Sequence, residues 1–140
     1  MSTYNGVIEK KLALLDDYYL KAQTLVPASH EALARNWERQ KAIERVLQVM
    51  VEIMIDIADR FIALHNHPPA ATSAESMQKL KELGIISDAG IYAQIVRFRN
   101  FIVHRYEQVD SEIMYTIMTN HLDDFLKYIR EIHDFITRNP

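Results

Sequence analysis

The sequence AIERVLQVMVEIMIDIADRFIAL, residues 42–64, predicts a long helix at the centre of the fold. Its apolar residues recur at intervals of three and four, the spacing of a helix whose apolar face packs into a bundle. The first apolar set is Ile43, Leu47, Met50, Met54, Ile57, Phe61 and Leu64. A second set, which widens the apolar arc, is Val51, Ile55, Ala58 and Ile62. Either helices of the same chain cover this wide arc, or part of it meets a second copy of the protein.

The same periodicity predicts helices along most of the chain. They cover about residues 4–25, 29–64 and 73–84, with a fourth helix starting at Ser87 or Asp88 and a last one at Asp110 or Ser111. Pro68 and Pro69 mark the only long loop, and Ser73 is expected to cap the helix that follows. Residues 1–140 are therefore expected to form a single all-α domain, an up-down antiparallel bundle of four to five helices.

Composition excludes several classes of protein. The chain has no cysteine, so disulfides, thiolate nucleophiles and cysteine zinc sites are excluded. A formal net charge of -3 argues against a broadly basic nucleic-acid binder, and any such contact must be local. The N-terminus does not resemble a signal peptide, and no apolar run reaches the ~18 residues of a membrane span. We expect a soluble cytoplasmic protein that does not contact the membrane.

A basic cluster interrupts this packing pattern. Three arginines and one histidine lie within residues 97–106, and no acid lies among them. Arginine donates planar, permanently charged hydrogen bonds to phosphate, and histidine readily exchanges a proton near neutral pH. RNA supplies its own nucleophile, the 2′-hydroxyl, so these groups suit RNA cleavage, with His104 as base or acid and Arg99 stabilising charge on the phosphate. A purely structural explanation also exists, because basic side chains at a helix C-terminus complement its dipole.

Helical geometry separates the members of this cluster. At ~100° per residue, Arg99 and Tyr106 share one flank of an ideal helix, whereas Arg97 and His104 share the other. Arg99 and His104 are then ~140° apart. Three explanations remain open: the helix loosens before His104, long side chains converge, or a second protomer completes the site.

The run Arg99-Asn100, three residues, then His104-Arg105-Tyr106 resembles the Arg-x4-His-x-Tyr signature of HepT toxins, a branch of the HEPN superfamily. The long central helix, the proline loop and the run 83–86 also resemble that family, so the similarity covers nearly the whole chain. The resemblance implies a homodimeric, metal-independent endoribonuclease of a toxin–antitoxin system, in which Arg99 and His104 are catalytic. It also implies that Asn100 supports the catalytic arginine, and that a minimal nucleotidyltransferase (MNT) antitoxin modifies Tyr106 with AMP.

Further expectations concern ligands and alternatives. Arg97 and Arg105 are expected to help bind RNA, and Arg97 competes with Arg99 for the dominant role. His65 and His67 lack a nearby third ligand, so neither a metal site nor any cofactor is expected. The alternative function is a non-catalytic HEPN module that binds a nucleotide or the nucleotidyltransferase without cutting RNA.

Overall fold

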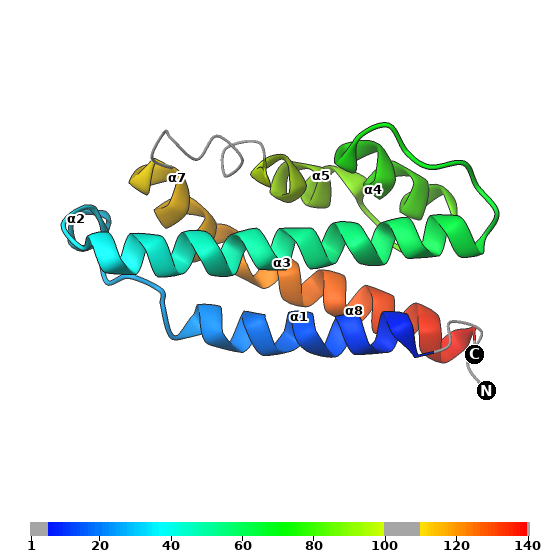
Figure 1. The fold of residues 1–140 in the computed structure, drawn as a ribbon, viewed down its shortest axis with the longest axis horizontal. Helices are drawn as coiled ribbons and strands as arrows, with labels where there is room; N and C mark the ends of the chain where they lie inside the picture. Colours follow the sequence, from blue (N-terminus) through cyan, green and yellow to red (C-terminus); the bar gives the residue numbers. More distant parts are fainter. Residues whose placement is uncertain (1–5, 100–109, 140) are drawn as a thin grey trace.

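The computed structural model describes residues 6–99 and 110–139, which form helices and no strands. Helix α3, Trp37–Leu64, runs along the length of the molecule, and the other helices pack around it (Figure 1). Helix α1, Val7–Gln23, packs against α3 and against the C-terminal helix α8, Leu122–Arg138. Helices α4, Ser73–Glu82, and α5, Ala89–Arg97, pack against each other on the side of α3 away from α1 (Figure 1). The predicted all-α bundle is confirmed.

The core is built on the wide apolar arc of α3. All members of the first set except Leu64 are buried, and so are the four residues of the second set, Val51, Ile55, Ala58 and Ile62. Contacts with α1 and with α4 and α5 account for this burial within one chain. The opposite stripe stays polar, and Asp56 on it pairs with Lys11 of α1 at 3.6 Å. Of the two explanations for the wide arc, the structure therefore favours coverage by the chain's own helices, and the arc gives no reason to expect a second copy.

The predicted single helix over 29–64 is wrong at one place. A short helix, α2, His30–Ala34, ends before α3 begins. Each helix has its own N-cap, because the Ser29 side chain accepts from the amide of Ala32 and the Asn36 side chain accepts from the amide of Arg39. A side chain that accepts a hydrogen bond from a backbone amide in the first turn stabilises the start of a new helix. Asn36 therefore permits the chain to change direction between α2 and α3.

The remaining helix starts follow the expected chemistry with one shift. Asp88 and Asp110 cap α5 and the helix α7, Ser111–Thr116, as expected. The cap of α4 is Thr72 and not Ser73, since the Thr72 hydroxyl accepts from the amide of Glu75 at 3.1 Å. Gly84 follows the end of α4 with a φ of 76°, the left-handed conformation that glycine adopts without strain.

The last helical region contains a π-helical turn that the sequence reading did not predict. Helix α7 runs into η1, Ile117–His121, which has π-helical hydrogen bonding and continues directly into α8. Such wider turns insert an extra residue into a helix and are frequent at functional sites. No described helix is both long and apolar enough to cross a membrane.

Candidate functional site

The described part of the basic cluster, Arg97 and Arg99, lies at the C-terminal end of α5. The opposite, N-terminal end of α5 is held by the carboxylate of Glu131 on α8. Glu131 accepts hydrogen bonds from the amide and hydroxyl of Ser87, at 3.0 and 2.5 Å, and from the Tyr92 hydroxyl at 2.5 Å. The Tyr92 ring also meets Tyr128 edge-on, with centroids 5.1 Å apart. Burial and the bond to Glu131 raise the pKa of Tyr92, so this phenol stays protonated. The N-terminal half of α5 is thereby attached to α8.

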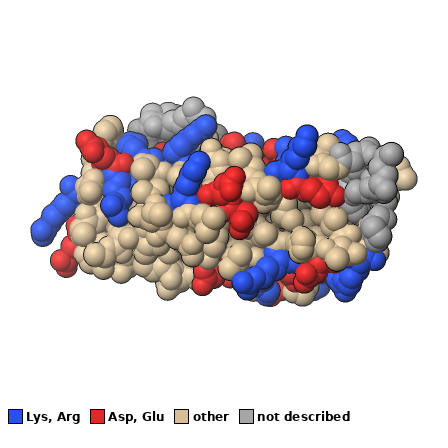
Figure 2. Space-filling model, turned by 90° about the horizontal axis from the view of Figure 1, so that it is seen from below, with Lys and Arg blue, Asp and Glu red and all other residues tan. Residues whose placement is uncertain are grey.

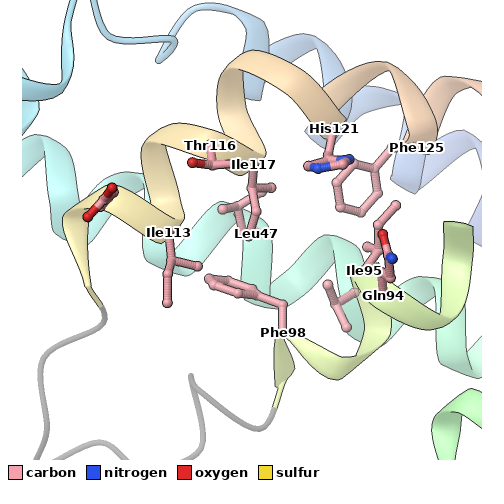
Figure 3. Close-up of a pocket in the computed structure, with 11 residues that line it drawn as sticks. Leu47, Gln94, Ile95, Phe98, Ile113, Thr116, Ile117, His121 and Phe125 are labelled. Carbon is pink, nitrogen blue, oxygen red and sulfur yellow. The ribbon is translucent and has the colours of Figure 1, made fainter.

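Phe98 anchors the other end of α5. It is the C-cap residue of the helix and is only 4% exposed. Its ring borders an apolar hollow of about 400 Å³ between α3, α5, the α7–η1 region and α8, and it points toward Leu47 and Ile113 (Figure 3). His121 lies on the far side of this hollow beside Phe125, with its Nδ1 3.0 Å from Asp124 Oδ2 (Figure 3). Burial of Phe98 therefore fixes the chain between its two neighbours, Arg97 and Arg99.

Arg97 and Arg99 are both exposed, and both line one groove of about 790 Å³. The facing wall is the loop that leads into α4, with the small side chains of Ala71, Thr72 and Ser73. Neither guanidinium group makes an ion pair or hydrogen bond with another residue in the described parts of the chain. Two fixed positive charges therefore face a space large enough for a ligand.

Two arginines that helical arithmetic separates line one groove. An unbroken helix would place Arg97 and Arg99 ~200° apart, on opposite flanks. Helix α5 ends at Arg97, but Phe98 keeps the right-handed helical conformation, with φ -56° and ψ -28°, so the two long side chains reach the same groove from different flanks. The three explanations left open all concern His104, which lies outside the described residues, so they stay predictions. Four predicted site residues lie outside the described residues, namely Asn100, His104, Arg105 and Tyr106.

The charge of the groove comes mainly from its two arginines. Its described lining holds one acid, Asp59, whose Oδ1 accepts a hydrogen bond from the buried Ser76 hydroxyl at 2.9 Å. On the face seen from below, acidic and basic side chains are interspersed rather than gathered by sign (Figure 2). The positive charge at the end of α5 is thus local, as the net charge of the chain requires.

The histidines of the proline loop form no metal cluster in the described structure. His65 Nδ1 lies 2.9 Å from the Phe61 carbonyl oxygen, and its ring packs near Phe61 and Phe135. Among the described residues, no group of three or more potential metal ligands comes together. His65 is explained by packing at the end of α3.

The sequence reading missed the groove wall contributed by the residues before α4. Ser73 was expected only to cap a helix and Thr72 was given no role, although both line the groove with the arginines. The sequence signal was the uncharged run of small residues 70–74 after the two prolines. Short side chains beside a basic cluster leave room for a ligand, but only the packing of α4 on α5 brings the two segments together.

Comparisons with known proteins identify the family of this chain. Residues 8–132 match the family described as Ribonuclease HepT-like. The tRNA nuclease HepT of Aphanizomenon flos-aquae (strain 2012/KM1/D3) is 24% identical over 132 residues, which cover 93% of this chain and 90% of that protein.

Two solved structures share the fold. The tri-AMPylated Shewanella oneidensis HEPN toxin, in complex with MNT antitoxin, has a TM-score of 0.80 and 22% identity, with 91% of this chain and 96% of that chain covered. YutE of Bacillus subtilis, a cytosolic protein of unknown function, has a TM-score of 0.82 and 14% identity, with 96% and 91% covered. At these identities the likeness to both structures is one of fold.

Proposed function

This chain belongs to the HepT-like ribonuclease family, and we propose that it is the toxin endoribonuclease of a HEPN/MNT toxin–antitoxin system and cleaves RNA without a metal ion. The observation that carries the proposal is the groove lined by the guanidinium groups of Arg97 and Arg99, which have no ion-pair or hydrogen-bond partner among the described residues. They stand immediately before the Asn100, His104 and Tyr106 positions of the family signature. The activity of the cyanobacterial relative, a tRNA nuclease by name, supports the same class of reaction.

The reaction uses the RNA's own hydroxyl as nucleophile. His104 takes the proton of the 2′-hydroxyl, and the 2′-oxygen attacks the adjacent phosphorus. The bond from phosphorus to the 5′-oxygen breaks, and that oxygen receives a proton from a second histidine, His104 of another copy of the chain. The products are a 2′,3′-cyclic phosphate and a free 5′-hydroxyl. Arg99 stabilises the negative charge that develops on the phosphate oxygens.

We infer a homodimer because one His104 cannot be both proton acceptor and proton donor in the same step. Asn100 would orient Arg99, and Arg97 and Arg105 would bind neighbouring phosphates. The partner is a cognate MNT antitoxin that transfers AMP to Tyr106, and the tri-AMPylated state of the Shewanella toxin in its MNT complex supports this regulation. Phosphates added two residues from His104 would repel the RNA backbone.

The test is RNA cleavage by purified protein, without antitoxin, in an excess of chelator. We expect cleavage that leaves a 2′,3′-cyclic phosphate and that Arg99→Ala and His104→Ala each abolish. Matched controls are Arg35→Ala and His133→Ala, which replace the exposed residue that follows α2 and an exposed residue on α8. Full cleavage by both Arg99→Ala and His104→Ala would refute the assigned roles.

A non-catalytic binding module predicts a different result. Such a protein would bind the MNT partner and leave every cellular RNA pool intact. Light scattering gives an independent test of the dimer, since a monomer at micromolar concentration would contradict the two-histidine reaction. Mass spectrometry of the Tyr106 peptide after incubation with MNT and ATP tests the modification.

A further inference from the structure

We propose that the groove between α5 and the residues leading into α4 binds the single-stranded RNA backbone beside the cleaved phosphate, with Arg97 as the positioning residue. This inference rests on the proposed ribonuclease function and deepens it. It assigns Arg97 a role different from that of Arg99, and it gives the loop 70–74 a role in substrate binding.

The size and lining of the groove suit a backbone and not a base. Its volume of about 790 Å³ lies within the ~300–1,000 Å³ of ligand sites. Its described lining contains two arginines, short polar or apolar side chains and no aromatic ring. Proteins that read or stack bases use aromatic platforms, whereas a positively charged groove follows phosphates. The groove should therefore bind RNA without strong sequence preference.

The two arginines occupy different positions along this path. Arg97 belongs to the last turn of α5, and Arg99 follows the buried Phe98. Because Phe98 fixes the chain between them, the two guanidinium groups are held as separate anchors and can contact successive phosphates. Arg99, nearer the family signature, contacts the reacting phosphate, and Arg97 contacts the next one along the strand.

Asp59 opposes this binding. It lies on α3 and lines the same groove, and Ser76 holds its carboxylate in place with a hydrogen bond of 2.9 Å. A fixed negative charge repels phosphate and keeps the RNA toward the arginines. Removing this charge should strengthen RNA binding, which is an effect that damage to the fold does not produce.

The experiment measures the affinity of the full-length protein for a 2′-O-methylated single-stranded RNA, which lacks the free 2′-hydroxyl and is not cleaved. Arg97→Gln should weaken binding roughly tenfold, the size of one charge-assisted contact. It should also reduce the slope of log affinity against log salt by about 0.7, the contribution of one single-strand phosphate. Asp59→Asn should tighten binding several-fold, because it removes a negative charge that repels phosphate. The Asn side chain can still accept the hydrogen bond from Ser76, so the local structure is kept.

Each variant has a matched control. Asp56→Asn removes the same charge from another exposed position of α3, outside the groove. Ala71→Glu places a new acid on the groove wall just before the α4 cap and should weaken binding. Ala28→Glu is its control, because it places an acid just before the Ser29 cap of α2, outside the groove, and should not weaken binding. Arg35→Gln is the control for Arg97→Gln.

Cleavage assays separate Arg97 from Arg99. Arg97→Gln should raise KM on a long strand and leave kcat nearly unchanged, and its effect should disappear on a dinucleotide, which has no second phosphate. Equal effects of each variant and its control would overturn the groove assignment, and so would loss of kcat on the dinucleotide. If the wild type cleaves no RNA but the groove variants still alter binding as stated, the ribonuclease proposal fails and the RNA groove stands.

Discussion

Tyr92→Phe tests whether the attachment of α5 to α8 stabilises the fold. The substitution keeps the ring, which is fully buried and packs edge-on against Tyr128 at 5.1 Å, and removes only the hydroxyl that donates to Glu131. A hydrogen bond to a charged group contributes about 1.5–3 kcal/mol. The lower value applies here, because the half-buried Glu131 keeps both bonds from Ser87 and water reaches the freed oxygen.

We therefore expect the free energy of unfolding to fall by about 1.5 kcal/mol and the melting temperature to fall by roughly 5 °C. Urea unfolding followed by circular dichroism measures the first quantity, and calorimetry measures the second. Tyr18→Phe is the control, since that hydroxyl makes no hydrogen bond with another described residue, and it should change stability by less than about 0.5 kcal/mol. If the two variants were equally stable, the Tyr92–Glu131 bond would have no part in holding α5.

Three other predictions concern α5, its preceding turn and the buried phenols. Phe98→Ala should lower the free energy of unfolding by about 3 kcal/mol and slow RNA cleavage at temperatures where the variant remains folded. Phe98→Leu should have a smaller effect on both quantities. Unchanged cleavage by the alanine variant would show that Phe98 does not position the arginines. Gly84→Ala should cost about 1 kcal/mol through backbone strain alone, since an added Cβ would meet nothing within 4 Å, and Gly84→Asn should cost less. Burial raises the pKa of Tyr92 and Tyr128, so both keep their protons in the folded state while the unfolded chain loses them above about pH 10. The contribution of these tyrosines to the free energy of unfolding should therefore be fully present below that pH and should fall above it by about 1.4 kcal/mol per pH unit for each tyrosine. Denaturation of the wild type and of Tyr128→Phe at rising pH tests this, because the free energy of unfolding of the variant should fall less steeply.

Local pattern was enough to predict most of the fold. The three-and-four spacing of α3 identified all of its buried residues except Ile53, and the side-chain chemistry of Asp88 and Asp110 identified two helix starts. The break at Asn36 was missed, although Asn is a good N-cap, because apolar periodicity on both sides suggested one helix. The resemblance to HepT toxins is confirmed by the family match.

The candidate site was predictable only in part. Composition identified Arg97 and Arg99, but ideal helical geometry placed them on opposite flanks. Their common groove depends on the reach of their side chains and on how α4 packs against α5, and this packing is a tertiary effect. The role of the second apolar set of α3 likewise depends on which helices cover it, which a period alone does not reveal.

The π-helical turn at Ile117–His121 has a consequence for how this chain tolerates changes in length. Three buried side chains follow one another at intervals of four residues, namely Met114, Met118 and Leu122. In a regular α-helix, two such intervals would place Leu122 ~80° around the helix axis from Met114. The wider turn compensates for this rotation and keeps the three side chains in line. Because the turn holds one residue more than a regular helix would, deleting one residue within it would give a regular α-helix and leave α7 in nearly the same orientation relative to α8. A deletion in the regular part of the helix would instead rotate one side by ~100° relative to the other. Only a deletion outside the turn would turn the α7 wall of the hollow away from Phe98, so the π-helical turn is the place where this helix tolerates the loss of one residue.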